Sequence, residues 1–257
     1  MASKNEYGEA LKGMGVIPPS QGIYEMSSAQ VCTLGHRIAF ADGRVFRYAK
    51  AGAVALAPGK FVKAGHTNHS INTVVNAAVA VGNNNVVVRT GAACTTGAEG
   101  YLQTNDAAGE GHLYKIKTTA ANSTTVAYTD VTLYDPIATA LVAATSEVSI
   151  LSNPYEQCEI VSAAGELVVG VPPITVTAEY YFWLQTWGLA SVLSNNTPTA
   201  GYVVYPSFSD DIGGTTIYNA ALNSGLTGSS VPIQAAGIQW LVGVDTEYKP
   251  VYLMICP

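Results

Sequence analysis

The sequence predicts an all-β protein, built as a β-sandwich or as one or more barrel-like domains. Many short runs rich in β-branched and aromatic residues are separated by turns at intervals of about ten residues, a spacing typical of sandwiches and barrels. Of the 257 residues, 12% are charged and 48% are hydrophobic. That composition is typical of a folded chain with a sizeable core and not of a disordered one.

The longest strand signal is the run from Gly170 to Gly188, GVPPITVTAEYYFWLQTWG. From Ile174 onward its alternation predicts a single long strand with one apolar face. The other face begins polar and ends aromatic, with Tyr181, Trp183 and Trp187. Few soluble proteins expose a large apolar patch. These three aromatic side chains therefore need a cover, which is either another part of the same chain or a partner subunit.

The first 29 residues are interpreted as an extended N-terminal arm that precedes a β-rich body over residues 30–257. The arm is rich in Gly and Pro and shows no convincing hydrophobic period. Termini often fray, but a purely solvated tail would not need apolar side chains. We expect the arm to dock on a partner through Val16, Ile17, Pro18, Ile23 and Tyr24.

A β-hairpin is predicted at residues 36–50, because Asp42-Gly43 favours a two-residue type I′ turn. Such a turn pairs Phe40 with Val45 and places Ile38, Phe40 and Val45 on one face. Further strands are expected at residues 70–80, 86–89, 113–117, 123–134, 158–162, 166–171, 191–193, 202–205, 238–244 and 250–255.

One short helix is predicted at residues 136–144, with Asp135 as its N-cap and Pro136 in its first turn. Residues 207–230 are rich in Gly and Ser, which predicts a long surface loop. The body also allows a division in which residues 86–155 form a β subdomain.

The composition argues against nucleic acid and membrane as partners. The net charge is −6, and phosphate binding needs clustered Lys and Arg. No segment approaches the ~20 apolar residues of a membrane span, and the start MASKNEYGEA contains no apolar signal run. We therefore expect synthesis in a cytoplasm with Cys32, Cys94, Cys158 and Cys256 reduced and buried, although a Cys32–Cys256 pair stays open.

No catalytic or metal-binding motif is complete in the sequence. His66 and His69 lack the further ligands that zinc requires, and Asp210-Asp211 lacks the spacing of a calcium loop. The sequence contains neither a Gly-x-Ser-x-Gly elbow nor a phosphate-binding loop. No pair of acids is marked as catalytic among Glu99, Glu110, Glu166, Glu179 and Asp245. We expect no enzyme activity, no metal and no cofactor.

Four strings, taken together, resemble virion structural proteins of tailed bacteriophages. They are RIAFADGRVFRYAKAGAVALAPGK, GYLQTNDAAGEGHLYKIK, TLYDPIATAL and GVDTEYKPVYLMI, and they occur in that order between His36 and Ile255. The resemblance implies a decoration, or cement, protein on the capsid exterior that binds the major capsid protein and stabilises capsomer joints. It also implies a homo-oligomer, with a trimer favoured because closed symmetry limits runaway association. In this role Tyr181, Trp183 and Trp187 would lie at the subunit interface.

Three other functions stay open. A head fibre, tail or adaptor component of the virion would differ in its copy number. A carbohydrate-binding module would use exposed Tyr and Trp, such as Trp183 and Trp187, as sugar-stacking platforms. A hydrolase with a dispersed active site would need carboxylates that only folding brings together.

Overall fold

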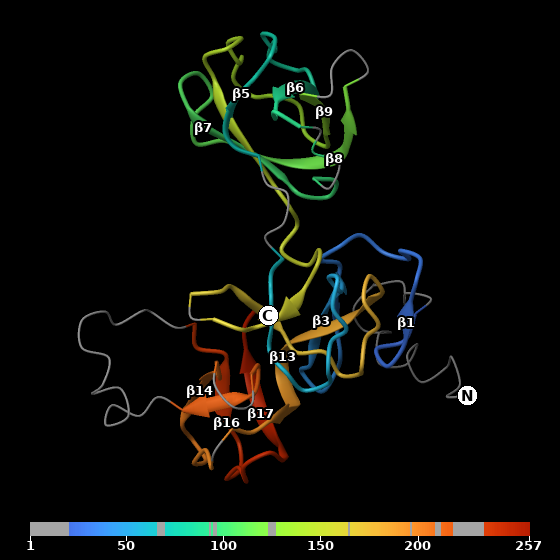
Figure 1. Cartoon of the computed structure of the whole chain (residues 1–257), viewed down its shortest axis with the longest axis vertical. Coiled ribbons are helices and arrows are strands. Elements are labelled where there is room, and N and C mark those ends of the chain that lie inside the picture. The colour runs from blue at the N-terminus through green and yellow to red at the C-terminus, as the bar shows by residue number, and fades with distance from the viewer. Residues whose placement is uncertain are drawn as a thin grey trace, which may run out of the picture. The chain divides into compact units, whose positions relative to one another are not determined.

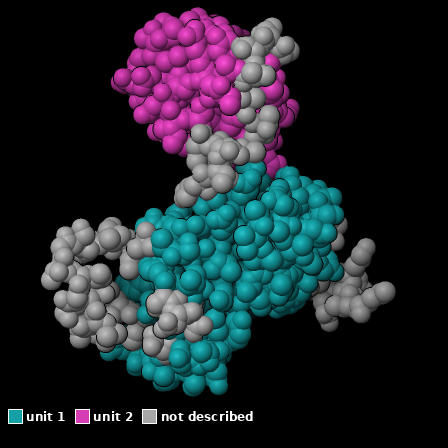
Figure 2. All heavy atoms as spheres, viewed as in Figure 1, with its two compact units in different colours: residues 1–65, 155–257 teal, residues 66–154 magenta. Residues whose placement is uncertain are grey.

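The computed structural model describes residues 21–65, 70–92, 94, 97–122, 127–163, 165–195, 197–208, 212–217 and 234–257. The chain forms two compact units, shown in teal and magenta in Figure 2. Unit 1 combines residues 1–65 with residues 155–257, and unit 2 comprises the intervening residues 66–154. Unit 2 thus begins earlier in the chain than the subdomain start expected near residue 86.

The described residues form an all-β structure, as the sequence predicted (Figure 1). The strands of unit 1 are β1 (Met26–Ser27), β2 (Arg37–Ala39), β3 (Val45–Lys50), β4 (Val62–Lys63), β11 (Glu159–Ile160), β12 (Val168–Gly170), β13 (Tyr181–Leu193), β14 (Val203–Pro206), β15 (Thr215–Ile217), β16 (Gly237–Gln239) and β17 (Tyr248–Met254). Strand β15 lies inside the segment that was expected to be a loop. In the described part of the chain, no helix is long and apolar enough to cross a membrane.

Strand β13 is the centre of the large sheet of unit 1. The strand order is β15-β14-β16-β17-β13-β3-β2, and β1 pairs with the start of β13. All of these pairings are antiparallel. A smaller sheet with the order β11-β4-β12 contributes side chains to the cores of the same unit.

Strand β13 begins at Tyr181 and not at Ile174, so the predicted long strand is wrong in its first half. A turn closed by the Tyr180 N–H and the Thr177 carbonyl, 3.2 Å apart, precedes the strand, and Glu179 has a φ of 65°. The preceding residues pair elsewhere, with Val176 bridged to Leu56. Alternating residue types continue through this turn, and no Gly, Pro or Asn marks it in the sequence.

The hairpin forms as predicted in place but not in register. Ala39 pairs with Val45 and Ile38 with Phe46. The Gly43 N–H donates to the Phe40 carbonyl at 3.0 Å, and Gly43 has a φ of 86°. This geometry is that of a three-residue loop ending in a left-handed glycine, the next most common hairpin after the two-residue type. The one-residue shift places Phe46 instead of Val45 in the core cluster with Ile38, and Phe40 packs against that cluster.

Residues 21–27 belong to the body of unit 1, so the predicted boundary of the arm at residue 29 is wrong. Met26 and Ser27 form β1 and pair with Phe182 and Tyr181 of β13. Ile23 is only 3% exposed and packs in a cluster with Leu34, Ile38, Phe46, Tyr48 and Trp183. The burial of Ile23 holds this segment against the sheet.

Unit 2 is a sheet that curls around a core of its own. Its strands are β5 (Ser70–Val74), β6 (Asn85–Arg89), β7 (Tyr101–Asp106), β8 (Leu113–Ala121), β9 (Tyr128–Leu133) and β10 (Glu147–Leu151), in the order β5-β10-β7-β8-β9-β6. The two ends of this order meet where Val75 bridges Val88 and the Asn76 N–H donates to the Val87 carbonyl at 2.7 Å. The core inside contains Val88, Leu102, Ile116, Val131 and Ile150.

The helix predicted at residues 136–144 is absent. The Ile137 N–H donates to the Asn83 carbonyl at 2.8 Å, and Leu141 forms a β-bridge with Val79. Both Ile137 and Leu141 are buried in the core of unit 2. These two residues, four positions apart, therefore lie in an extended segment. Its hydrogen bonds to Asn83 and Val79 replace those of a helix.

We expect unit 2 to fold when it is produced alone as residues 66–154, because all members of its core cluster lie within that range. We expect unit 1 to fold when residues 66–154 are replaced by a short Gly-Ser linker, since Gly65 packs so closely on Gln157 that a Cβ would collide with its carbonyl oxygen. Circular dichroism during thermal unfolding would show a cooperative transition for each fragment. A gradual, non-cooperative loss of signal from either one would contradict this expectation.

Candidate functional site

Trp183, one of the three aromatic residues expected at a subunit interface, is covered by the protein's own chain. It has no exposed surface, and its indole N–H donates to the Gln21 carbonyl at 2.9 Å. The Tyr48 ring packs edge-on against it with 5.0 Å between centroids. The interface prediction is therefore wrong for Trp183, because segment 21–27 supplies its cover.

The polar atoms around Trp183 are also paired. The Tyr48 hydroxyl donates to Gln21 Oε1 at 2.9 Å and accepts from the Val31 N–H at 3.2 Å. Burial raises the pKa of Tyr48 to about 12, although the Val31 N–H acts in the opposite direction. This tyrosine therefore remains a neutral donor over the whole physiological pH range.

Tyr181 and Trp187 are both half-buried, but they lie in different surroundings. Tyr181 stacks on Tyr48 with 5.9 Å between ring centroids, at the rim of the Trp183 cluster. Trp187 instead packs edge-on against Tyr252 of β17 at 6.2 Å. The three aromatic residues of β13 therefore do not form one continuous surface.

The residues expected to dock the arm also separate. Val16, Ile17 and Pro18 lie outside the described residues. Ile23 is buried within unit 1 and is not available to a partner. Tyr24 is 60% exposed and remains available.

An exposed apolar surface lies on the sheet formed by β14, β16, β17 and β13. Val203 pairs with Ile238, Ile238 with Tyr252, and Tyr252 with Leu189, so these four side chains form one row on the same side of the sheet. Trp187 and Met254 pair beside this row. We call these six residues the outward face, and Leu189, Val203, Ile238 and Met254 in it are 38–46% exposed.

The opposite side of the same strands covers a core. Val204, Ala190, Val251 and Leu253 are buried there together with Phe61. An antiparallel sheet with one buried side normally carries polar residues on its other side. Apolar residues on both sides make the outward face a candidate for contact with another protein surface.

The outward face continues into an exposed loop, residues 240–244, which we call the apolar loop. Trp240, Leu241, Val242 and Val244 are 48–61% exposed. Backbone hydrogen bonds hold the loop in place, from the Trp240 N–H to the Pro250 carbonyl at 3.1 Å and from the Gly243 N–H to the Pro198 carbonyl at 2.8 Å. A strand was predicted over residues 238–244, but β16 ends at Gln239.

The apolar loop was missed as a site by sequence reasoning, although a signal was present. The string WLVGV contains four apolar residues that do not alternate with polar ones. A strand on the surface of a sheet should alternate. Only the structure shows that these side chains remain uncovered instead of filling a core.

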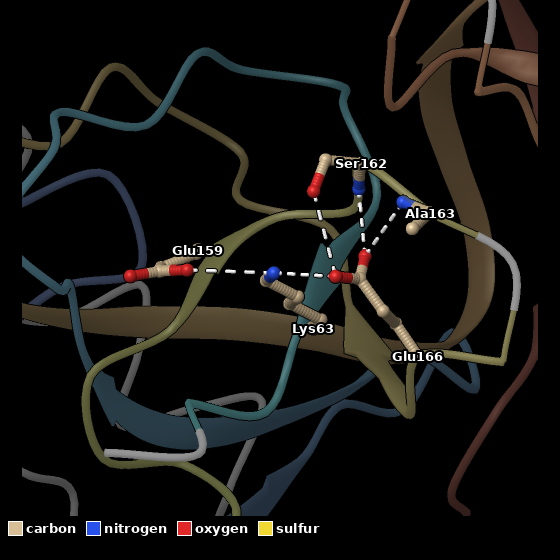
Figure 3. Close-up of polar contacts among 5 residues, drawn as sticks. All are labelled: Lys63, Glu159, Ser162, Ala163 and Glu166. Atoms are coloured by element: carbon tan, nitrogen blue, oxygen red, sulfur yellow. Dashed lines mark hydrogen bonds and ion pairs between the residues drawn. The ribbon is translucent and has the colours of Figure 1, made fainter.

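A charged cluster joins the strands of the small sheet (Figure 3). Lys63 Nζ lies 2.5 Å from Glu166 Oε1 and 3.5 Å from Glu159 Oε2. The other carboxylate oxygen of Glu166 accepts the N–H groups of Ser162 and Ala163 at 2.7 and 3.0 Å. These contacts close the turn before β12 and hold it against β4. The role of this cluster is therefore structural.

The pairing determines the protonation state of Glu166. Burial raises the pKa of this carboxyl group, but the Lys63 ammonium and the two backbone N–H donors outweigh it and lower the pKa below its usual value. Burial in turn lowers the pKa of Lys63, and the hydrogen bond and charge of Glu166 more than reverse that effect. Both groups therefore stay charged at neutral pH.

Glu179 and His112, two other residues considered for chemistry, have separate partners. Glu179 pairs with Lys50 at 2.5 Å, and His112 stacks on Tyr114 with 5.8 Å between ring centroids. Within the described ranges, no group of three or more His, Cys, Asp or Glu side chains is arranged to hold a metal ion. His66, His69, Asp210 and Asp211 lie outside those ranges.

None of the four cysteines forms a disulfide. Cys94 and Cys158 are buried, and burial raises the pKa of Cys158. Cys32 and Cys256 are only half-buried and do not form the pair that the sequence left open.

Comparison of the chain with known protein families, with curated proteins and with solved structures finds no match.

Replacing Trp183 with Ala should lower the free energy of unfolding by about 3–5 kcal/mol, since it leaves a large cavity and unpaired polar atoms. Trp240→Ala is the matched control, because Trp240 is 57% exposed, and it should change the free energy by less than about 0.5 kcal/mol. Urea denaturation measures both. Equal effects of the two substitutions would contradict the assignment of Trp183 to the core.

The Lys63–Glu166 pair should stabilise the folded protein at neutral pH and lose this effect at acidic pH. Because the folded state lowers the pKa of Glu166, the pair stabilises the protein above the unfolded pKa, roughly 4.3. This contribution is lost as the pH falls through the folded pKa. Glu166→Gln should therefore cost about 1–3 kcal/mol near pH 7 and much less near pH 3.

The control is Glu247→Gln, which removes an exposed pair with Lys249 at 2.7 Å and should cost at most about 0.5 kcal/mol at either pH. Chemical denaturation at both pH values measures the four free energies. A cost of Glu166→Gln that is the same near pH 3 and pH 7 would show that the charge of this carboxylate does not stabilise the fold.

Proposed function

We propose that this chain is a structural protein that covers other protein subunits and carries out no chemistry of its own. The observation that supports this proposal best is the outward face with the adjoining apolar loop. These residues belong to paired strands and to a hydrogen-bonded loop, yet they expose Leu, Ile, Val, Met and Trp side chains. Apolar surface of this kind is typical of a protein-interaction site.

The setting that we propose is the outside of a tailed-bacteriophage capsid. Support comes from the four strings that resemble phage virion proteins, which fall on structural elements of both units. RIAFADGRVFRYAK covers the β2–β3 hairpin, and GVDTEYKPVYLMI covers β17. The partner would be the major capsid protein, and the function would be to stabilise the joints between capsomers.

Contact with the shell is assigned to the N-terminal residues. The segment from Gln21 to Ser27 is fixed on β13, so the residues before it are attached to unit 1 at a defined point. Tyr24, beside that point, is exposed. The apolar residues Val16, Ile17 and Pro18 would then contact the shell, while residues 21–27 hold this end of the chain on unit 1.

The alternative within the virion is a head fibre, tail or adaptor component. Copy number separates these locations, because a shell protein is present in hundreds of copies and a vertex or tail protein in a dozen or fewer. A cryo-EM map of the intact particle would show both the position and the number of copies.

A carbohydrate-binding module is the second class of function, and the exposed indole of Trp240 is the observation in its favour. Trp183 is buried and cannot serve as a sugar platform. The neighbours Leu241 and Val242 carry no side-chain group that could hydrogen-bond a sugar hydroxyl. Glycan-array binding that is lost with Trp240→Ala would favour this class over the capsid protein.

Removing residues 1–20 should abolish binding to capsids that lack this chain, while the truncated protein unfolds like the full chain. Removing residues 1–29 should also destabilise the fold, because Gln21 and Ile23 cover Trp183. Co-sedimentation with capsids and thermal unfolding measure the two properties. Full decoration by the protein without residues 1–20 would reject the role of the arm, and no binding of the full chain would reject the proposed function.

A further inference from the structure

We propose that the outward face of the β14-β16-β17-β13 sheet binds the same face of a second copy of this chain, around a two-fold axis. This inference rests on the proposed structural function. It identifies the surface through which copies of the chain would associate. It replaces the trimer expected from the sequence with a two-fold pair.

The first argument is the shape of the surface. The row of Val203, Ile238, Tyr252 and Leu189 crosses four neighbouring strands in continuous register. Sheets of this kind pack face to face at a separation of about 10 Å, with side chains of the two faces interdigitating. A second copy presents a sheet of the same kind, and a two-fold axis through the row makes the contact self-complementary.

The second argument is charge. The chain carries a net charge of −6, so acidic side chains within a contact between two copies would add to their mutual repulsion. The outward face has no charged side chain, and the adjacent positions Ser191 and Pro250 are uncharged as well. A charged partner would find no group to pair with on this face, whereas a second, equally uncharged copy can be buried there without desolvating a charge.

The third argument is the amount of surface. Together, the outward face and the apolar loop still expose on the order of 600 Å² of apolar side chain, if each aliphatic or aromatic residue is counted at about half of its full area. A stable pair buries about 800 Å² per partner, including a polar rim. Exposed Thr246 and the neutral Lys249–Glu247 ion pair lie just beyond the apolar loop and supply such a rim.

The test measures the mass of the full-length protein by analytical ultracentrifugation in the absence of capsids. We expect twice the 26.8 kDa of one chain. Ile238→Asp should weaken the pair about 100-fold or more, because two like charges would face each other near the axis. Ile238→Lys should do the same, and an equimolar mixture of the two variants should pair again.

Val54→Asp is the matched control, because Val54 is an apolar residue that is 66% exposed outside the outward face, and it should leave the mass unchanged. Circular dichroism checks that each variant is folded. If Ile238→Asp does not fold, Leu189→Asp takes its place on the same row.

Three results would overturn the inference. They are a wild-type protein that stays monomeric at about 100 μM, a wild-type mass of three chains, and an oligomer that the charged variants leave intact. Loss of capsid binding by Ile238→Asp without any change in mass would assign the face to the shell instead. Because mass is measured without capsids, failure of the pair leaves the proposed capsid function to be judged by its own binding test.

Discussion

The pairing of β13 along both of its edges is the constraint on which unit 1 depends. Its first half pairs with β3 on one edge and β1 on the other, and its second half pairs with β17. Gly188 in the middle allows the backbone of the β2–β3 loop to approach, since a Cβ there would lie only 3.0 Å from Arg44 Cα. The extra residue between Gln185 and Trp187 shifts the register against β3. The two halves of this long strand therefore lie in different surroundings.

The two halves of β13 differ in which residues cover their side chains. Around Trp183, the cover is the chain's own segment 21–27, which supplies an apolar contact through Ile23 and a hydrogen-bond acceptor through Gln21. A buried indole needs both, because an unpaired N–H is costly. In the second half, Leu189 and its neighbours on β17 and β16 are equally apolar but have no such cover among the described residues. The proposed function follows from this difference.

Two of the ion pairs among the described residues close turns. Glu166 holds the turn before β12 with Lys63, and Asp42 pairs with Arg44 at 2.6 Å beside the hairpin loop. The outward face carries no charged side chain. Such a distribution suits a protein that covers other proteins, since the desolvation of charges would oppose association.

The sequence by itself determined the all-β class, the place of the hairpin and the apolar alternation of β13, because a period of two is a local property of consecutive residues. It did not determine the hairpin register, since Asp42-Gly43 suits both a two-residue and a three-residue loop. It also missed the extended course of residues 136–144, where pairing with Val79 and Asn83 replaced helical hydrogen bonds. Only the tertiary structure decided that Trp183 is covered while Trp240 is exposed, because burial depends on segments that are distant in the chain.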